Sequence, residues 1–304
     1  MLPLALGVGL GLLVAAAART RARCVTRVED ECATRLPLGP DGVVVGASAF
    51  ALVAGDDAPA VLLVHGAGDT PQTLRYLADD LHARGFTVYA PLLPGHGRAV
   101  RQFAAVSAEG WLEAVRVALD AARARHAWVG IVGLSLGGAL AVRLAAERPE
   151  LPAVGLIAPY LAMPALVRGA ARSSRLWGVV FPYVRASRGR PSILDPVERQ
   201  RALGYGYFTP AALRALRATV DAAVAALPRV RVPALIVQSR DDNRIPPDAA
   251  ERAFARLGAA EKVLRWVGGA HVLTVDTERA QVFDIVATWL EEHGARPAPR
   301  QHAS

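Results

Sequence analysis

The residues that most clearly could do chemistry lie in Gly133-Leu134-Ser135-Leu136-Gly137, a Gly-x-Ser-x-Gly sequence between an apolar run and an alanine-rich helical pattern. A strand that turns sharply into a helix needs small residues beside the turn, and Gly133 and Gly137 supply them. The residue at the apex is forced into a strained backbone conformation, and its side chain is pushed outward. The sequence therefore predicts that Ser135 is a catalytic nucleophile on a strand-turn-helix elbow.

A serine hydroxyl is a poor nucleophile at neutral pH, so Ser135 needs a base, and the base needs an acid that orients it. Asp241 and Asp242 follow one later apolar run, and His271 follows another. This gives the chain order serine, acid, histidine. Because all these residues follow strands of a parallel sheet, they are expected at its carboxyl edge, where such sheets bind ligands. The spacing leaves either aspartate as the acid.

Two earlier histidines compete with His271 for the role of base. His96 lies in a proline-glycine loop after an early strand and precedes Ser135 in the chain, so we expect it to brace that loop. His65 ends an apolar run directly before a glycine, and we expect it to order the turn. His271 lies between glycines and a new helix, in no apolar stripe, and is the predicted base.

The negative charge that develops on an attacked carbonyl oxygen needs two hydrogen-bond donors, which form an oxyanion hole. One is expected to be the backbone N–H of Leu136, the residue after the nucleophile. The other is expected from Ala67, in the sequence His65-Gly66-Ala67-Gly68 after an early strand. The alternative is that this glycine-rich segment is only a tight turn.

Alternating apolar runs and helical patterns position these residues. Continuous apolar runs are typical of parallel strands buried on both faces. Strands are predicted over residues 60–64, 86–90, 128–133, 153–158, 234–239 and 262–267. The alternation predicts an α/β domain over residues 36–294, with a mostly parallel central sheet and helices on both faces. Before it, residues 43–45 and 49–53 predict an antiparallel hairpin at the edge of the sheet.

Residues 160–231 break this alternation, because they contain several prolines and helical pieces but no clear strand. We interpret the segment as a helical cap, inserted after a central strand and lying over the active site. Its aromatic residues lie beside arginines. This content fits either a lid that touches lipid or a packed cap with solvated arginines, and we favour the packed cap.

The N-terminal residues 1–23 differ from the rest of the chain. Leu2 to Ala18 carries no charge and is just long enough to span a bilayer as a helix. We expect a membrane anchor, and the arginines that follow it favour the cytoplasmic side for the catalytic domain. The alternatives are a cleaved signal with export, or a loose apolar tail. At the other end, residues 295–304 are expected to form a frayed tail.

The composition excludes several other classes of protein. The chain has 304 residues, of which 53% are hydrophobic, as expected for one large globular domain. The net charge is +8. All the basic residues except one are arginines, and they are scattered along the chain. A coding bias towards arginine explains this distribution better than nucleic-acid binding does. No metal-binding set is visible, and no glycine-rich phosphate or dinucleotide loop. We therefore predict no cofactor, no metal and no nucleic-acid partner.

Several short segments together resemble the α/β-hydrolase superfamily, and more narrowly bacterial carboxylesterases and monoacylglycerol-lipase-like serine hydrolases. They are Leu-Leu-Val-His-Gly, Pro-Gly-His-Gly, Gly-Leu-Ser-Leu-Gly-Gly, the Asp-Asp loop and Gly-Ala-His. The resemblance covers residues 42–292 and implies the α/β-hydrolase fold. Segments 237–242 and 270–276 are similar to the acid and histidine loops of thermophilic Bacillus-type carboxylesterases. In those carboxylesterases the catalytic acid matches the second of the two acidic positions. The resemblance therefore implies that Asp242, rather than Asp241, is the acid that orients His271. The resemblance does not extend to the N-terminal segment or to the cap.

These observations predict an enzyme that hydrolyses carboxylic esters, either short- to medium-chain acyl esters or monoacylglycerols. Ser135, His271 and Asp242 are its expected catalytic residues, and its partner is a small-molecule ester. Amide, thioester or lactone hydrolysis by the same residues is one alternative, because the fold alone does not fix the chemistry. A membrane-anchored binding protein without catalysis is another. The sequence gives no prediction of the oligomeric state.

Overall fold

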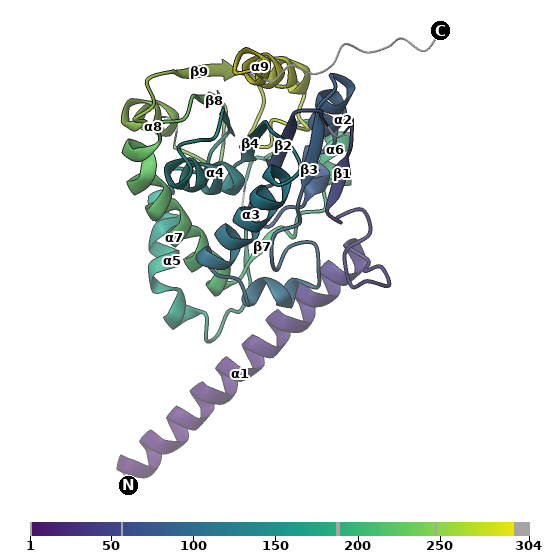
Figure 1. Cartoon of the computed structure of the whole chain (residues 1–304). Helices are drawn as coiled ribbons and strands as arrows, with labels where there is room; N and C mark the ends of the chain where they lie inside the picture. The colour runs from purple at the N-terminus through teal and green to yellow at the C-terminus, as the bar shows by residue number, and fades with distance from the viewer. Residues whose placement is uncertain (1, 56, 187–188, 247, 295–304) are drawn as a thin grey trace.

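The computed structural model describes residues 2–55, 57–186, 189–246 and 248–294, with side chains of the first helix described from residue 11 onward. A seven-stranded sheet forms the centre of the molecule, with the strand order β1-β3-β2-β4-β5-β8-β9 (Figure 1). Its strands are β1 (Phe50–Leu52), β2 (Ala60–Val64), β3 (Thr87–Ala90), β4 (Val129–Leu134), β5 (Val154–Ile157), β8 (Ala234–Ser239) and β9 (Lys262–Val267). All neighbours pair in parallel except β1, which pairs antiparallel with β3. The predicted tail, 295–304, lies outside the described residues.

Helices cover both faces of the sheet, which confirms the predicted α/β architecture. They are α2 (Arg75–Ala83), α3 (Ala108–Arg123), α4 (Leu136–Glu147), α8 (Ala249–Arg256) and α9 (Arg279–Glu292). The position of strand β2 between two layers of helices explains why its sequence is apolar throughout. Leu62 belongs to the hydrophobic core shared with α3 and α4, and Leu63 belongs to the core shared with α2 and α9. Successive side chains of a strand point to opposite faces, so a central strand needs apolar residues at every position.

The predicted hairpin at residues 43–45 and 49–53 is wrong. Residues 50–52 do form a strand, but it pairs with β3, with Phe50 opposite Ala90. Val44 instead forms a single bridge with Leu38. Neither pairing could be predicted from the local sequence pattern. Strand propensity indicates that a segment is extended, but it does not indicate which other segment pairs with it.

The cap lies between β5 and β8 and contains α5 (Ala165–Trp177), α6 (Pro196–Arg201) and α7 (Pro210–Ala226). It also contains two short strands, β6 (Val184–Arg185) and β7 (Tyr207–Phe208), which pair antiparallel. The expectation of a cap without a strand is therefore wrong in this detail. Strands of two residues are too short to show an alternating pattern in the sequence.

The first helix, α1 (Leu2–Arg35), is longer than the predicted N-terminal segment and leaves the domain as a rod (Figure 1). Its last turns pack on the domain, where Val28 and Cys32 join the hydrophobic core, as does Leu36 directly after the helix. Within the part of the chain that the structure describes, no helix combines the length and the apolar character needed to cross a membrane. Side chains of residues 1–10, which include half of the predicted anchor, lie outside that part. The anchor therefore stays a prediction.

Candidate active site

Ser135 occupies the sharp turn between β4 and α4. Its φ of 56° lies in the left-handed region, which is strained for a residue with a side chain. Glycine is required on both sides. A Cβ on Gly137 would overlap the carbonyl of Val64, and a Cβ on Gly133 would overlap the backbone of Gly137. The Ser135 N–H donates to the carbonyl of Ile157 on β5 at 3.0 Å, which fixes the turn to the neighbouring strand.

The structure brings Ser135, His271 and Asp242 together from three separate loops at the carboxyl edge of the sheet. The Ser135 Oγ lies 2.8 Å from Nε2 of His271, and Nδ1 of the same ring lies 2.8 Å from Oδ2 of Asp242. A carboxylate only accepts hydrogen bonds, so Nδ1 carries the proton. Nε2 is then the acceptor for the serine hydroxyl. This is the arrangement in which a histidine can take the proton of an attacking serine.

Several donors hold the Asp242 carboxylate in its charged form. Burial alone would raise its pKa. The charge and hydrogen bond of His271, the backbone N–H of Arg244 and the side-chain amide of Gln238 outweigh burial and hold the pKa below its ordinary value. The Gln238 and Arg244 contacts are each 2.8 Å long. The carboxylate is therefore ionised at neutral pH and can orient the imidazole and stabilise its protonated form.

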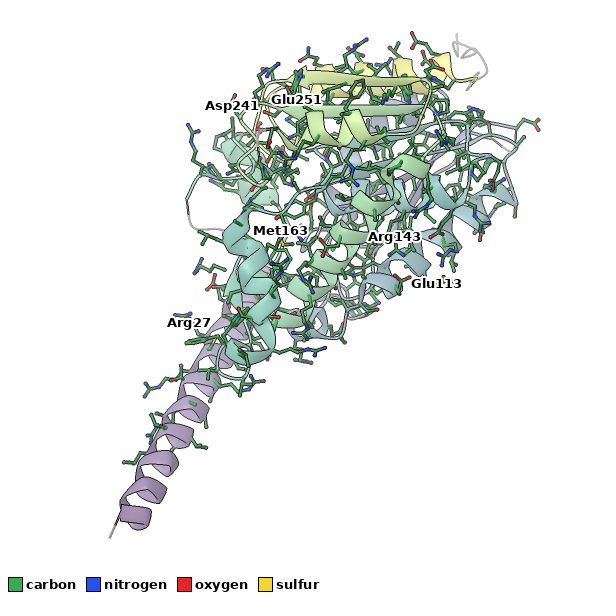
Figure 2. All side chains as sticks on the ribbon, turned by 90° about the vertical axis from the view of Figure 1, so that its left-hand side faces the viewer. Arg27, Glu113, Arg143, Met163, Asp241 and Glu251 are labelled. Atoms are coloured by element: carbon green, nitrogen blue, oxygen red, sulfur yellow. The ribbon has the colours of Figure 1, made fainter. Side chains whose placement is uncertain are left out.

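Asp241, the other acid that the sequence left open, points elsewhere. Its side chain is exposed at the outer surface of the molecule (Figure 2). Its backbone N–H donates to Oγ of Ser239 at 3.0 Å, which shapes the loop after β8. The loop thus directs Asp242 inward and Asp241 outward.

The two predicted donors of the oxyanion hole flank Ser135. Leu136 is the first residue of α4, where a backbone N–H has no carbonyl from a preceding helical turn to accept it. Ala67 lies in the loop after β2 and lines the same pocket as Ser135. The preceding glycine packs closely on the serine: a Cβ built on Gly66 would lie 3.4 Å from the Ser135 Cβ. The loop of Ala67 therefore passes beside Ser135, and the role of Ala67 and Leu136 as donors stays a prediction.

His65 orders the turn after β2, and His96 braces its own proline-glycine loop, where its Nδ1 lies 3.1 Å from the carbonyl of Pro94, as expected from their positions in the sequence. His65 accepts a hydrogen bond from the N–H of Leu93 at 3.1 Å and contacts the carbonyl of Gly66 at 2.9 Å. The rings of His65 and His96 meet edge to face, with centroids 5.0 Å apart. Burial lowers the pKa of His65 to about 4 and that of His96 well below its ordinary value. Both rings are therefore neutral at physiological pH.

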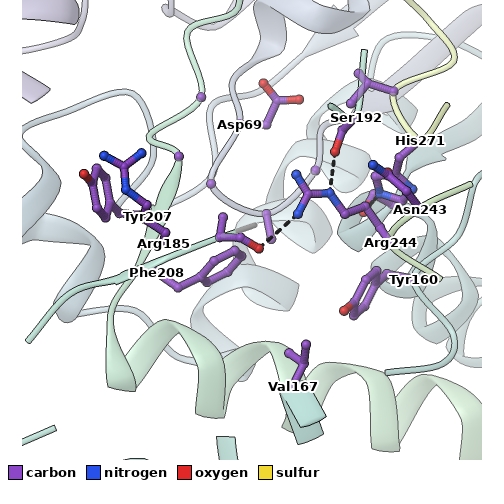
Figure 3. Close-up of a pocket in the computed structure, with 18 of the residues that line it drawn as sticks. Asp69, Tyr160, Val167, Arg185, Ser192, Tyr207, Phe208, Asn243, Arg244 and His271 are labelled. Atoms are coloured by element: carbon purple, nitrogen blue, oxygen red, sulfur yellow. Dashed lines mark hydrogen bonds between the residues drawn. The ribbon is translucent and has the colours of Figure 1, made fainter. Parts of the chain in front are cut away.

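A pocket with a volume of about 1250 Å³ opens over Ser135 and His271, between the sheet and the cap (Figure 3). Apolar residues of the cap helices line part of it, among them Val167 of α5 and Leu216 of α7. The structure also places residues there that the sequence did not single out, including Asp69, Tyr160 and Arg244. Asp69 and Arg244 lie beside recognised segments, but no local pattern marks any of the three as a pocket residue, so only their position in space reveals them. Burial raises the pKa of Asp69 to about 6.

Among the described residues, no group of three or more histidine, cysteine or acidic side chains is arranged to hold a metal ion.

Comparison with known proteins places the chain in a family. Residues 55–278 match the family model Hydrolase_4, described as serine aminopeptidase, S33. The chain is 27% identical to the thermostable monoacylglycerol lipase of Bacillus sp. (strain H-257) over 240 residues, which cover 77% of this chain and 90% of the lipase. It is 26% identical to a carboxylesterase of Bacillus subtilis (strain 168), over 82% of this chain and 98% of the esterase.

A solved structure from the metagenome-derived lipolytic enzymes LipS and LipT superposes with a TM-score of 0.75 at 28% identity, covering 83% of this chain and all of that chain. These findings confirm the resemblance to lipases and esterases and the predicted fold. They also set aside the alternative of a binding protein without catalysis. The chain belongs to the Hydrolase_4 family, described as serine aminopeptidase, S33, and is an α/β-hydrolase enzyme of the lipase and esterase type.

Proposed function

We propose that this enzyme cleaves short- to medium-chain acyl esters or monoacylglycerols through an acyl-enzyme formed on Ser135. The observation that carries the proposal is the continuous hydrogen-bonded series from Ser135 through His271 to Asp242 at the base of an open pocket. A serine on a strained turn, an imidazole whose Nε2 faces the hydroxyl and a buried carboxylate are the groups that acyl transfer requires.

In the first step, Oγ of Ser135 attacks the ester carbonyl carbon, and its proton moves to Nε2 of His271. Asp242 stabilises the imidazolium that forms. The carbonyl oxygen becomes negatively charged and accepts hydrogen bonds from the backbone N–H groups of Ala67 and Leu136. The carbon–oxygen bond to the alcohol then breaks, and the imidazolium returns the proton to the leaving alkoxide.

In the second step, water enters the place that the alcohol has left. His271 takes a proton from this water, and the resulting hydroxide attacks the acyl carbon bound to Ser135. Breaking the bond to Oγ releases the carboxylic acid, and the imidazolium returns its proton to the serine. The enzyme is then in its starting state, and one ester and one water have become an alcohol and an acid.

The substrate class is inferred from the pocket and from the relatives. The apolar cap residues along the pocket suit an acyl chain, since burying each methylene is favourable by about 0.8 kcal/mol. The two curated relatives named above are a monoacylglycerol lipase and a carboxylesterase. Both names describe the hydrolysis of carboxylic esters, and the first names monoacylglycerols as substrates.

Hydrolysis of p-nitrophenyl acetate, butyrate and decanoate by the wild-type chain and two serine variants tests this proposal. Ser135→Ala is expected to lower kcat by about 10⁴-fold or more, because no other group replaces the nucleophile. Ser173→Ala, at an exposed position on α5, is the matched control and should keep the wild-type rate. Unchanged turnover in Ser135→Ala would overturn the proposal. A higher kcat/KM for butyryl anilide, butyryl thioester or a lactone than for the ester would favour the alternative chemistries.

A further inference from the structure

Asp276 is a buried carboxylate that the proposed mechanism does not use. It follows His271 by five residues, its side chain is 0% exposed, and it does not line the pocket. Four backbone N–H groups donate to its two oxygens, and no side chain among the described residues does. A carboxylate taken out of water is costly unless donors replace its hydration, so these four contacts strongly constrain the segments that supply them.

The four donors belong to two parts of the chain that meet at this carboxylate. Oδ2 accepts a hydrogen bond from the N–H of Ala270, the residue before His271, at 2.7 Å. Oδ1 accepts from the N–H groups of Leu194 and Asp195 in the cap, at 2.8 Å and 3.0 Å, and from the neighbouring Thr277 at 3.1 Å. One oxygen therefore holds the histidine loop, and the other holds the cap.

The cap segment held in this way contacts the backbone of His271 itself. We call residues 190–195 the clasp. The carbonyl oxygen of Ser192, within the clasp, accepts hydrogen bonds from the N–H groups of His271 and Val272, at 3.1 Å and 2.9 Å. The backbone of His271 is thus held by the cap as well as by its own loop.

The acid loop holds the clasp from the other side. The side-chain amide of Asn243 donates to the carbonyls of Arg190 and Pro191, at 2.6 Å and 2.9 Å. Nε of Arg244 donates to Oγ of Ser192 (Figure 3). The clasp therefore bridges the loop after β8, which carries the acid, and the loop after β9, which carries the histidine.

This bridge lies where the sheet no longer fixes the two loops. Strands β8 and β9 pair in parallel up to Ser239 opposite Val267, where the ladder ends. Beyond the strand ends, backbone groups need other hydrogen-bond partners. The contact of 2.8 Å between Nε2 of His271 and Oγ of Ser135 leaves little room for movement, since a hydrogen bond weakens steeply once its geometry is lost.

We propose that Asp276 is a positioning residue for His271 and acts through the cap. By fastening the clasp to the histidine loop, it keeps the Ser192 carbonyl on the backbone of His271 and Nε2 within reach of Ser135. This inference rests on the proposed role of His271 as the base and adds how the cap takes part in its alignment. The packing of the cap on the sheet domain then affects the chemical step as well as the shape of the pocket.

Asp276→Asn tests the proposal with little change in volume. An amide keeps one acceptor oxygen, and its NH2 group faces N–H donors on the other side, so either the histidine loop or the cap loses its acceptor. Labelling of Ser135 in excess fluorophosphonate is expected to slow by about 30- to 100-fold, because a displacement of the base by about 1 Å costs about that much. With p-nitrophenyl butyrate, kcat should fall to a similar extent while KM stays within about threefold, since Asp276 does not line the pocket.

The labelling curve separates positioning from a general loss of structure. Its amplitude counts the folded molecules, and its rate constant reports how fast each of them reacts. A merely structural role lowers the amplitude in Asp276→Asn and leaves the rate constant at the wild-type value.

Asp41→Asn is the matched control. Exposed Asp41 also accepts a backbone hydrogen bond, from the N–H of Val43 at 3.1 Å, but it lies before β1 and does not line the pocket. Its labelling rate constant should stay within about twofold of the wild-type value, because the same chemical change is made away from the base.

A double-mutant cycle with His271→Ala shows whether Asp276 acts through the base. Labelling of His271→Ala is expected to be slow already, and adding Asp276→Asn should change its rate constant by less than about threefold, because no imidazole is left to position. A further slowing by the full factor of about 30 to 100 would overturn the proposal.

Hydrogen exchange measured residue by residue tests the part of the cap. The N–H groups of His271 and Val272 donate to Ser192 and not to Asp276, so their exchange reports whether the clasp has left the histidine loop. In Asp276→Asn both amides should exchange at least about tenfold faster than in the wild-type chain. Wild-type protection of both amides would contradict coupling through the cap.

Failure of this inference can be told apart from failure of the proposed function. A wild-type rate constant in Asp276→Asn, together with slow labelling in His271→Ala, overturns the positioning role and leaves His271 as the base. Labelling of His271→Ala at the wild-type rate contradicts the proposed function instead, because the serine then needs no histidine.

Discussion

Two adjacent aspartates follow β8, and the loop directs only one of them, Asp242, towards His271. Asp242 accepts hydrogen bonds from the His271 ring, from the Gln238 amide and from backbone N–H groups, whereas Asp241 is exposed. The sequence could not separate the two by spacing, since adjacent residues follow the same strand. Only the resemblance to known acid loops favoured Asp242, and the hydrogen bonds supply the physical reason.

Asp242→Asn is predicted to lower kcat on p-nitrophenyl butyrate by about 10³- to 10⁴-fold, because an amide no longer fixes the tautomer of His271 or stabilises its cation. Asp241→Asn should stay within about twofold of the wild-type rate. The measurement is steady-state kinetics of both purified variants, with circular dichroism to show that each is folded. Equal losses in the two variants would contradict the assignment of Asp242.

The buried pair of His65 and His96 makes the fold sensitive to acid. An unfolded histidine takes up a proton near pH 6.5, whereas folded His65 stays neutral down to its pKa of about 4. Its contribution to stability is therefore fully present above pH 6.5 and is lost as the pH falls towards 4. The burial of His96 acts in the same direction.

The free energy of unfolding, measured with urea at pH 7.5 and pH 5, tests this effect. For His65 alone, about 2 kcal/mol of stability should be lost between these pH values. The loss should be smaller by that amount in His65→Gln, which cannot take up a proton. His82→Gln, a half-buried histidine on α2, is the control and should lose as much as the wild-type chain. An identical pH dependence in all three would show that His65 is not held neutral.

At the scale of elements, α1 is joined to the oxyanion loop through the cap. Arg35 at the end of α1 donates to the carbonyls of Gly204 and Tyr205 at 2.8 Å and 2.6 Å. The Tyr205 N–H in turn donates to the carbonyl of Gly68 at 2.8 Å, next to Ala67. The loop that carries Ala67 is thus linked to the last turn of α1, a part of the chain for which the sequence pattern predicted no element.

Arg35→Ala is predicted to lower kcat on neutral p-nitrophenyl butyrate by about 3- to 10-fold with little change in KM, because a displaced donor weakens transition-state binding more than substrate binding. Arg21→Ala is the matched control. Arg21 also lies on α1 and donates to cap carbonyls, those of Gly178 and Val179, but these do not connect to the loop. Equal kcat values for wild type and Arg35→Ala would contradict the coupling.

The elements that the sequence predicted well are those with strong local patterns. Strands β2, β8 and β9 have the predicted bounds, because continuous apolar runs between turn residues mark buried strands. The side chain of Ser107 caps α3 by accepting a hydrogen bond from the N–H of Gly110 at 3.0 Å, and serine is one of the residues that favour this position. The pairing of β1 with β3 and the strands of the cap depend on contacts between distant segments, which no local pattern records.

At the scale of the whole molecule, the pocket belongs to no single segment. Residues from α1, the oxyanion loop, the cap and the acid and histidine loops all line it. That Ser135, His271 and Asp242 meet at one site could be predicted, because each follows a recognisable strand and turn. The arginines that line the pocket could not be predicted, since arginines are common along the chain and only folding shows which of them share one cavity.

The most direct test of the central claim is trapping of the nucleophile with a fluorophosphonate, followed by mass spectrometry of the peptides. The account predicts one adduct per chain, located on Ser135, with labelling abolished in Ser135→Ala and slowed by at least about 10³-fold in His271→Ala, because the serine then lacks its base. Absence of any adduct from the active wild-type enzyme, or an adduct on another residue, would contradict Ser135 as the nucleophile.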